Sequence, residues 1–338
     1  MKAVLFHEHG GPEVLALEEV PEPDPPGPGE VRVAVAAVAL NHLDLWVRRG
    51  LPLRIEMPHV GGSDFAGVVD ALGAGVTGLA TGDGVVGWPV LGAGPDGALP
   101  RGRFAILGEE KNGACCERLV LPAQNLLPLP AGVAFEAAAA LPVVFTTAWT
   151  MLVERGRLAR GETLLVQGAS SGVGTAAIQL GKLLGARVIA ATRGPEQGAR
   201  ARALGADEVI DAARERIHLR VHQLTGRAGA DVVFEHVGPA TWDESVRSAA
   251  YQGRLVTCGG TTGASAPTHL PFLFGKRLEI HGITLGSKQA LARVLALVAE
   301  GQLRPVLDRV LPLADCRRGH ELLESGAVFG KLVLRVPA

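Results

Sequence analysis

Cysteine is scarce in this chain, and its few cysteines are not spaced as metal ligands or disulfide partners. There are 4 cysteines among 338 residues, and none of them belongs to a C-x-x-C pair. Cys115 and Cys116 are adjacent, whereas Cys258 and Cys316 stand alone. Zinc knuckles and disulfide-rich secreted domains need regularly spaced pairs. We therefore expect neither feature, and a reducing, cytoplasmic setting fits this cysteine usage best.

Long apolar runs and a strong charge of one sign are also missing. No uninterrupted apolar run is long enough to span a bilayer, and the opening MKAVLFHEHGG reaches His7 too early for a signal peptide. The net charge of −1 gives no electrostatic reason to bind nucleic acid or an anionic membrane. A hydrophobic content of 47% with 20% charged residues predicts a well-packed globular protein instead.

The first third of the chain consists of short β-type runs that glycine and proline interrupt. These runs alternate or carry β-branched side chains, and the stretch PEPDPPGPG, residues 21–29, is a stiff turn between two of them. The pattern predicts a small β-barrel or a folded antiparallel sheet. The clearest predicted strands are Lys2–Phe6, Val31–Val38, Phe65–Ala71 and Asp83–Trp88.

From about Ala134 onward, helix-type segments alternate with short apolar strands. This alternation implies right-handed crossovers and a parallel sheet covered on both faces, that is, a doubly wound α/β fold with six strands. The predicted strands are Thr163–Val166, Arg187–Ala191, Glu208–Ile210, Asp231–Phe234, Arg254–Cys258 and Leu278–Thr284. The predicted helices are Thr175–Leu184, Gln197–Leu204, Ala213–Leu224 and Thr241–Ala250.

The last part of the chain is too short to form a domain of its own. It offers helices over Ser287–Glu300 and Ala314–Ser325 and one strand, Lys331–Val336. We predict that this segment returns to the β-rich domain and completes it. The predicted domains are a β-rich catalytic domain of residues 1–126 and 286–338 and a dinucleotide-binding domain of residues 127–285.

The stretch TLLVQGASSGVGTAAIQL, residues 163–180, predicts a site for a dinucleotide pyrophosphate. An apolar strand enters the glycines Gly168, Gly172 and Gly174, and a helix-forming run leaves them. Glycine lets the backbone approach the phosphates, and the free N–H groups of the first helical turn point at the negative charge. An extra residue after Gly168 departs from the simplest G-x-G-x-x-G, but the strand–turn–helix context supports the prediction. We include Ser171 and Val173 of the same turn in the site.

Several strings along nearly the whole chain resemble the medium-chain dehydrogenase/reductase superfamily. They are ALNHLDLWVRRG (39–50), PHVGGSDFAGVV (58–69), GDGVV (82–86), LPVVFTTAW (141–149), QGASSGVGTAAIQLGKLLGARVI (167–189), LGADEVID (204–211) and FGKLVLRV (329–336). The branch that they resemble most comprises the quinone oxidoreductases and zinc-free alcohol-dehydrogenase-like relatives. The resemblance implies a GroES-like β-barrel domain completed by the C-terminal tail, and a Rossmann domain with a six-stranded parallel sheet.

The same resemblance bears on zinc. Zinc-dependent members hold a catalytic ion with three Cys, His or carboxylate ligands, and the matching positions here carry Asn41, Ser63 and Val143 or a neighbour. The loop that holds four cysteines around a structural zinc in many relatives contains none. Cys115 and Cys116 follow this loop in a predicted strand. We therefore expect no zinc of either kind. A residual site would have to use His42, His59, Asp44 and Asp64, whose spacing matches no established ligand set.

The residues after the second strand of the dinucleotide domain bear on cofactor choice. NAD-preferring members carry an acidic residue there, whereas this chain has Thr192 followed by Arg193. No carboxylate repels a 2′-phosphate, and a guanidinium is available to pair with it, so we expect NADPH. NADH stays open, because Arg193 is equally compatible with a solvated surface residue and Gln197 stands where NADPH-binding relatives are often basic.

Further cofactor contacts are implied by role. Thr147 lies where the family's interdomain helix faces the nicotinamide. Val237 and Gly238 follow the fourth strand, and Gly259 and Gly260 follow the fifth, at the carboxyl edge where ligands bind to such sheets.

The resemblance places Asn41, His42 and Ser63 in strings that line the substrate cleft of relatives. Any of them is a candidate hydrogen-bond donor to a developing enolate or hydroquinone oxygen. Two structural roles stay open: Asn41 as a tie for the loop that follows its strand, and His42 as a structural histidine.

Together these residues predict a zinc-independent, NADPH-dependent oxidoreductase that transfers hydride to a quinone or an activated alkene or carbonyl acceptor. One alternative is an alcohol or aldehyde dehydrogenase of the zinc-type family, and the other is a non-catalytic NADPH-binding protein. Because relatives often dimerise through the edge strand of the dinucleotide domain, here Leu278–Thr284, we expect a homodimer or homotetramer. The only other expected partner is a small-molecule acceptor.

Overall fold

The computed structural model describes residues 1–94 and 96–337 and divides the chain into two compact units. Unit 1 comprises Met1–Val143 and Ser287–Ala338, and unit 2 comprises Val144–Gly286. This division falls later than the predicted boundary at residue 126. The reason is that β10 (Leu126–Pro128) pairs with β6 (Gly84–Gly87), and α2 (Phe135–Ala139) contacts strands of the same sheet.

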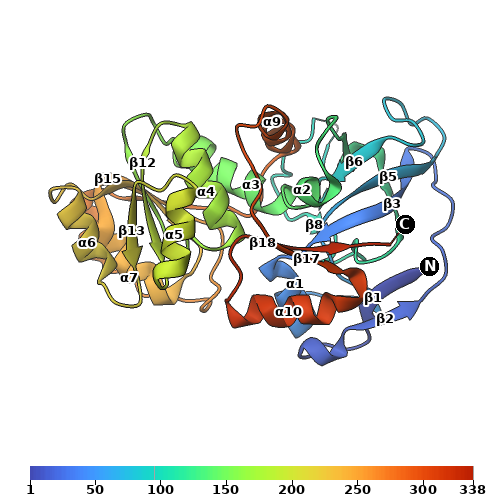
Figure 1. Cartoon of the computed structure of the whole chain (residues 1–338), viewed down its shortest axis with the longest axis horizontal. Helices are drawn as coiled ribbons and strands as arrows, with labels where there is room; N and C mark the ends of the chain where they lie inside the picture. Colours follow the sequence, from blue (N-terminus) through green and yellow to red (C-terminus); the bar gives the residue numbers. More distant parts are fainter. Residues whose placement is uncertain (95, 338) are drawn as a thin grey trace. The chain divides into compact units, whose positions relative to one another are not determined.

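A seven-stranded sheet forms the body of unit 1 (Figure 1). Its order is β10-β6-β5-β3-β18-β17, and β9 also pairs with β3. The new strands have the bounds β3 (Glu30–Ala39), β5 (Asp64–Leu72), β9 (Arg118–Pro122), β17 (Leu307–Pro312) and β18 (Lys331–Arg335). The pairing of β18 with β3 confirms that the tail completes the β-rich domain. Strand β17, parallel to β18, was not predicted.

Smaller elements surround this sheet within unit 1. A three-stranded sheet has the order β2-β1-β4, and β7 pairs with β8. The bounds are β1 (Lys2–Phe6), β2 (Ala16–Glu19), β4 (His59–Val60), β7 (Val90–Leu91), β8 (Ala105–Ile106), α1 (His42–Arg49), α9 (Lys288–Ala299) and α10 (Cys316–Ser325). Helix α10 packs against α1 and β18.

The prediction that Cys115 and Cys116 lie in a strand was wrong. They form a bend between β8 and β9, where only Cys116 makes an isolated bridge, to Ala3. Backbone bonds of Cys115 go to Val4 and Gly61 instead of a regular strand partner. The buried apolar character that resembled a strand comes from packing in the core of unit 1, where both cysteines are almost fully buried.

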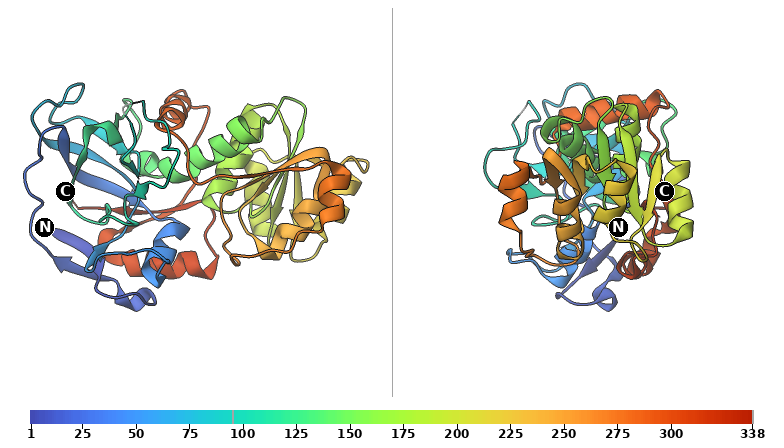
Figure 2. Two further views of the ribbon diagram at one scale, coloured as in Figure 1. Left: turned by 180° about the vertical axis from the view of Figure 1, so that it is seen from behind. Right: turned by 90° about the vertical axis from the view of Figure 1, so that its left-hand side faces the viewer.

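Unit 2 is a doubly wound α/β domain, as predicted. Its six strands are all parallel in the order β13-β12-β11-β14-β15-β16, with helices on both faces (Figure 2). The strands are β11 (Thr163–Val166), β12 (Arg187–Thr192), β13 (Glu208–Asp211), β14 (Ala230–Glu235), β15 (Ala249–Thr257) and β16 (Glu279–Gly282). The helices are α3 (Pro142–Trp149), α4 (Gly172–Leu183), α5 (Pro195–Ala203), α6 (Ile217–Leu224), α7 (Pro239–Ser248) and α8 (Leu270–Lys276).

The helix α8 was not predicted, because its seven residues, with Pro271 at the second position and Gly275 near the end, give little helical periodicity. Helix α3 crosses the boundary between the two units and continues as a π-helical segment over Thr150–Arg155. None of the helices in the described part of the chain is both long and apolar enough to cross a membrane.

Candidate active site

Sheet register brings a polar cluster together in the core of unit 1. Strands β3 and β18 are antiparallel, with Ala39 opposite Val333, so two residues further along Asn41 meets Lys331. Ala39 is also paired with Asp64, the first residue of β5. Asn41, Asp64 and Lys331 therefore come from chain positions that are far apart and meet because three strands begin or end at one place.

The polar side chains of this cluster form hydrogen bonds with one another. The Asn41 side-chain N–H donates to Asp64 Oδ2 at 3.0 Å, and the other oxygen of Asp64 accepts from the Val143 N–H at 2.9 Å. The Lys331 ammonium donates to Asn41 Oδ1 at 2.5 Å and to the Leu40 carbonyl at 2.8 Å, and it lies 3.4 Å from Asp64 Oδ2. Asn41 thus uses both ends of its amide inside the protein.

Burial dominates the electrostatics of this cluster. It raises the pKa of Asp64 and lowers the pKa of Lys331, and the attraction between the two charges partly offsets both effects. Both oxygens of Asp64 accept hydrogen bonds, as an ionised carboxylate does. We therefore treat Asp64 and Lys331 as a buried ion pair that the Asn41 amide bridges.

A second carboxylate fixes the loop beside the cluster. Asp44 accepts from the Asn41 N–H at 2.6 Å and from the Gly62 N–H at 3.1 Å. The first of these bonds closes the N-terminus of α1, where Asp three residues after the N-cap is a common capping arrangement. Burial raises the pKa of Asp44 to about 6, against the nearby charges of His320 and Lys331. Asp44 therefore ties the start of α1 to the 61–64 segment.

The other two predicted catalytic residues lie in contrasting settings. Ser63 is fully buried, and its hydroxyl has no hydrogen-bond partner among the described residues. His42 is exposed at the first position of α1. A buried hydroxyl without a partner is costly unless a ligand or water completes it, so Ser63 is the polar group in this region that is available to a bound molecule.

The cluster of Asn41, Ser63, Asp64 and Lys331 does not offer the usual donor set of a zinc ion. Of the predicted substitute positions, Asn41 and Ser63 offer neither a thiolate nor an imidazole, and Lys331 already places a positive charge against the Asp64 carboxylate. A divalent cation would have to displace or neutralise this ammonium. Across residues 1–94 and 96–337, no three His, Cys, Asp or Glu side chains are grouped so that they could hold a metal.

In unit 2, parallel register aligns the carboxyl ends of the central strands. Val166 is paired with Ala190 and with Phe234, and Phe234 with Val256. The loops that follow these four strands therefore gather at one edge of the sheet. This edge contains every predicted cofactor residue except Thr147, which belongs to α3.

The glycine turn after β11 is close-packed at two of its predicted glycines. Gly168 has a φ of +55°, and a Cβ on Gly174 would lie 2.6 Å from the Gly168 carbonyl oxygen. Ser171 caps α4 by accepting from the Gly174 N–H at 2.9 Å. Gly172 and Val173 are the first two residues of α4, so their N–H groups face outward from the helix start.

Two further predicted contacts carry unpartnered hydroxyls. Thr147 and Thr192 are buried, and neither hydroxyl has a partner within the described residues. Arg193 is exposed directly after Thr192 at the end of β12. Its backbone N–H lies 3.4 Å from the side chain of Gln197. The second strand of the sheet thus ends with a hydroxyl that has no partner among the described residues, followed by an exposed arginine.

The remaining predicted positions belong to two loops in close contact. Val237 accepts from the Thr262 N–H at 2.9 Å. A Cβ on Gly238 would lie 2.9 Å from the Gly260 Cα atom, and Gly238 itself has a φ of +89°. Gly259 and Gly260 directly follow β15. Glycine at 238 and 260 therefore allows the loops after β14 and β15 to pack backbone to backbone.

Sequence reasoning missed the residue that organises the first of these loops. The Glu235 carboxylate is fully buried at the end of β14. It accepts from the Val237 N–H at 2.6 Å, the Gly238 N–H at 3.0 Å and the hydroxyls of Thr241 and Ser245. The sequence signal for this role is an acidic residue at the end of an otherwise apolar strand.

His236 joins this loop to the glycine turn. Its Nε2 lies 3.1 Å from the Ser171 hydroxyl, which already accepts from Gly174, so the hydroxyl proton is free to be donated to an unprotonated Nε2. Burial lowers the pKa of His236, which favours this neutral form. The sequence places His236 directly after the fourth strand, beside the predicted cofactor residues, but it does not reveal the contact with Ser171.

Comparison with known proteins covers both units. Residues 27–131 match the family model of the alcohol dehydrogenase GroES-like domain, and residues 172–300 match that of the zinc-binding dehydrogenases. A quinone oxidoreductase of Pseudomonas aeruginosa is 35% identical over 98% of this chain and 99% of its own length.

Two solved structures extend the likeness to three dimensions. A structure described as an NAD-dependent alcohol dehydrogenase is 43% identical, with a TM-score of 0.94 and complete coverage of both chains. The Escherichia coli quinone oxidoreductase complexed with NADPH is 29% identical, with a TM-score of 0.87 over 99% of this chain and 100% of the other. The chain therefore belongs to the medium-chain dehydrogenase/reductase superfamily and is an NAD(P)H-dependent, quinone oxidoreductase-like enzyme of that superfamily.

Proposed function

We propose that this protein is a zinc-independent, NADPH-dependent oxidoreductase that transfers hydride to a quinone or to an activated alkene or carbonyl acceptor. The observation that carries the proposal is the buried cluster of Asn41, Asp64 and Lys331. Where zinc-dependent relatives provide a thiolate and an imidazole, this chain has the Asn41 amide and the Ser63 hydroxyl. The neighbouring Asp64 carboxylate is already paired with the Lys331 ammonium group, which also donates to Asn41.

The absence of ligands for a Lewis acid limits the choice of acceptor. Simple ketones and aldehydes need their carbonyl polarised before they accept hydride efficiently. Quinones and conjugated enones or enals supply this electron demand themselves. The chain then has only to bind the cofactor, orient the acceptor, exclude water and stabilise the oxygen that becomes negative.

The residues of unit 2 fit NADPH through their open polar groups. We assign the pyrophosphate to the turn from Gly168 to Gly174, and the adenosine 2′-phosphate to Arg193, with Thr192 beside it. We also assign the nicotinamide side to Thr147, whose hydroxyl has no partner among the described residues. When bound, NADPH supplies the hydride.

On the acceptor side, the Ser63 hydroxyl is our candidate donor. Its hydroxyl has no partner in the described chain, whereas the Asn41 amide is engaged at both ends. We therefore assign Ser63 to the acceptor oxygen and Asn41 to positioning of the 61–64 segment through Asp64. His42, exposed at the start of α1, has room to exchange a proton with solvent.

The test is an acceptor panel with the purified full chain. We expect oxidation of NADPH when a benzoquinone or a conjugated enone is added, with no loss of rate after treatment with a chelator and dialysis. NADH should support a lower kcat/KM. Turnover of neither acceptor class would contradict the proposal.

An alcohol dehydrogenase is the second candidate, because the 43% identical structure carries that description. Stoichiometric zinc in metal analysis, together with alcohol oxidation that a chelator abolishes, would favour it over the proposal. Tight NADPH binding without turnover of any acceptor would instead favour a non-catalytic binding protein.

We further propose that the chain forms a homodimer or homotetramer in the cytoplasm. Strand β16 is paired on one side only, with β15, and Ile280 on this strand is exposed. Leu270 and Phe274 of α8 are also largely exposed. An unpaired apolar edge favours a second copy as cover. Light scattering of the purified chain and cell fractionation test the two statements.

A further inference from the structure

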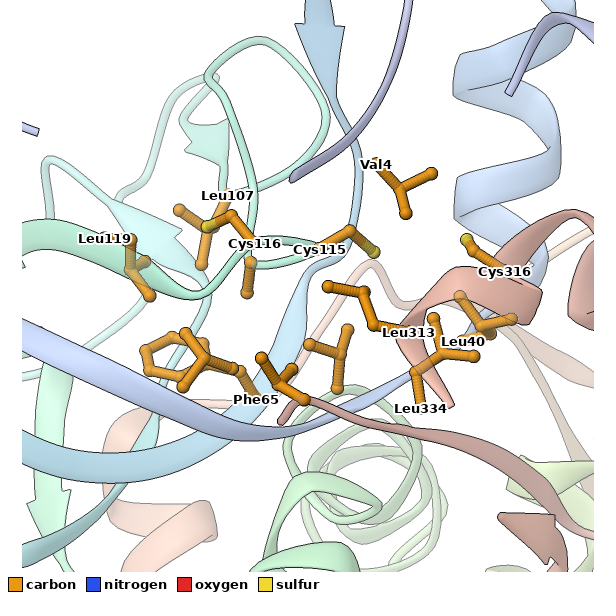
Figure 3. Packing of buried hydrophobic residues seen from close by; sticks show 14 of the residues in the cluster. Val4, Leu40, Phe65, Leu107, Cys115, Cys116, Leu119, Leu313, Cys316 and Leu334 are labelled. Atoms are coloured by element: carbon orange, nitrogen blue, oxygen red, sulfur yellow. The ribbon is translucent and has the colours of Figure 1, made fainter. Parts of the chain in front are cut away.

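Two cysteines from distant parts of the sequence meet in the core of unit 1. Cys316 is the first residue of α10, and Cys115 lies in the bend before β9. Their sulfur atoms point into the same gap, next to Val4 (Figure 3). Each thiol is the largest influence on the pKa of the other, raising that of Cys115 and lowering that of Cys316. The two cysteines are therefore neighbours in the same buried cluster of unit 1.

The surroundings of Cys316 favour its thiolate form. An Arg48 N–H lies 3.2 Å from His320 Nδ1, so Arg48 holds this imidazole in place. His320 follows Cys316 by about one helical turn, on the same face of α10, and it favours the thiolate of Cys316. The start of α10 adds the favourable end of a helix dipole.

The acidities of the four thiols differ accordingly. Hydrogen bonds from Cys115 and His320 and the charges of His320 and Arg48 lower the pKa of Cys316 to about 5. The contact with Cys316 and burial hold the pKa of Cys115 well above its usual value. Burial raises the pKa of Cys116 and of Cys258 to about 12. A nucleophilic thiolate thus faces a protonated thiol, which is the arrangement of an attacking and a resolving cysteine.

A surface pocket is lined by residues that neighbour this pair. It has a volume of about 380 Å³, and Val4, Asp315 and Arg317 are among its lining residues. Asp315 and Arg317 flank Cys316 in sequence, and the Val4 N–H donates to the Cys115 carbonyl at 2.8 Å. Cys316 is itself almost fully buried. Neither cysteine lines the pocket, but its lining includes residues adjacent to both of them.

We propose that Cys115 and Cys316 form an oxidisable dithiol that reacts with hydrogen peroxide or a small organic hydroperoxide. The Cys316 thiolate attacks one peroxide oxygen, the O–O bond breaks, and Cys316 becomes a sulfenic acid while the other oxygen leaves as hydroxide or alkoxide and takes up a proton. The Cys115 sulfur then attacks the Cys316 sulfur, and the hydroxyl leaves as water with the Cys115 proton. The two thiols lose two electrons, and the peroxide gains them.

The pair has a direct structural link to the proposed acceptor site. The Cys115 N–H donates to the Gly61 carbonyl at 3.0 Å, and a Cβ on Gly62 would lie 2.8 Å from the Cys115 sulfur. Gly62 in turn donates to Asp44. Movement of Cys115 toward Cys316 therefore displaces the segment that carries Ser63, and we expect oxidation to lower the reductase activity. This last expectation rests on the proposed function, whereas the disulfide itself does not.

The decisive experiment maps disulfides in the full-length wild-type protein. The reduced protein is treated with hydrogen peroxide, the remaining thiols are blocked, and peptides are separated without reductant. We expect free thiols to fall from four to two, and a single cross-linked species that joins the Cys115 and Cys316 peptides. Retention of all four thiols, or a cross-link through Cys116 or Cys258, would overturn the proposal. This readout needs no variant and no assumption about activity.

Variants then separate attack from resolution. Cys316→Ser should slow thiol loss at least about tenfold, whereas Cys115→Ser should accumulate a sulfenic acid that a dimedone reagent labels on Cys316. Cys258→Ser, in unit 2, is the matched control and should behave as the wild type. Equal rates for Cys316→Ser and Cys258→Ser would also overturn the proposal. A disulfide that forms while no acceptor is ever reduced would uphold this inference and contradict the proposed function.

Discussion

The buried polar cluster of unit 1 and the carboxyl edge of the sheet in unit 2 differ in whether their polar groups already have hydrogen-bond partners. In unit 1, Asn41, Asp64 and Lys331 complete one another's hydrogen bonds across three strands. In unit 2, the hydroxyls of Thr147 and Thr192 have no partner within the described chain, and the start of α4 presents free N–H groups. A closed cluster stabilises the fold around a site, whereas open groups mark where a molecule binds.

The cluster of unit 1 balances its own charge. A lysine on the returning strand β18 lies 3.4 Å from the Asp64 carboxylate and compensates it. At the carboxyl edge of the sheet in unit 2, the interactions that we propose for the cofactor come from backbone N–H groups and short hydroxyl side chains. Each half of the comparison can be tested by removing one group.

Removing the buried ammonium should have the largest effect. We expect Lys331→Met to lower the free energy of unfolding by about 3–5 kcal/mol, because Asp64 is left as an unpaired buried charge. Asp64→Asn in the same chain should restore part of this loss. Chemical denaturation measures both. Lys182→Met is the matched control, since it removes one partner of the exposed pair Lys182–Asp207 and should cost less than about 1 kcal/mol.

The loss should also depend on pH. Without Lys331, nothing of comparable size offsets the burial that raises the pKa of Asp64. A carboxyl whose pKa is raised in the folded state stabilises the fold below its unfolded pKa and loses this contribution as the pH rises through the folded value. The destabilisation of Lys331→Met should therefore shrink as the pH falls through the raised pKa of Asp64 toward the range of a free aspartate. A pH-independent difference would show that the cluster is not an ion pair.

The glycine turn offers the corresponding test in unit 2. Gly174→Ala brings a Cβ to 2.6 Å from the Gly168 carbonyl oxygen, so the turn must open. We expect the Kd for NADPH to rise about 100-fold, which corresponds to about 2.7 kcal/mol. Fluorescence titration measures the change. Gly275→Ala on α8, where no atom lies within 4 Å of the added Cβ, should bind NADPH as the wild type does.

The sequence predicted the dinucleotide unit closely because local signals and global fold agree there. The strand at Thr163–Val166 was predicted to the residue, and the helix after the glycines followed from its turn chemistry. The periodicity of hydrophobic residues and the spacing of glycines are local patterns, so a single sequence is enough to recognise them. The returning tail was predicted from its shortage of elements, and β18 confirmed it.

What the sequence did not reveal depends on long-range register. Lys331 lies almost three hundred residues after Asn41, and only the pairing of β18 with β3 brings them together. The same is true of Glu235, whose role depends on a loop that folds back on it, and of Cys115, which looked like part of a strand. Side-chain partners across a sheet are set by register, which a single sequence does not specify.

The Ser63 hydroxyl lies next to Asp64 in the chain and has no partner among the described residues, so its removal tests the open side of the comparison. We expect Ser63→Ala to lower kcat/KM for the acceptor by about 10- to 100-fold, as loss of a hydrogen bond to a developing charge does, and to leave the Kd for NADPH unchanged. Stopped-flow rates of NADPH oxidation measure it. Thr150→Val removes another buried hydroxyl without a partner in the described chain and should change neither value. Equal losses in both variants would assign Ser63 a structural role only.

The smallest effect is expected at Arg193, where exposure weakens every charge interaction. If its guanidinium pairs with the 2′-phosphate, Arg193→Ala should raise the Kd for NADPH about tenfold and leave the Kd for NADH unchanged, because only NADPH carries that phosphate. The difference should fade in high salt, since the side chain is exposed. Arg220→Ala, an exposed arginine on α6 paired with Glu215, controls for the general loss of positive charge. If Arg193→Ala raised the Kd for NADPH and for NADH equally, Arg193 would not determine the cofactor preference. The backbone groups at the carboxyl edge of the sheet would then be its source.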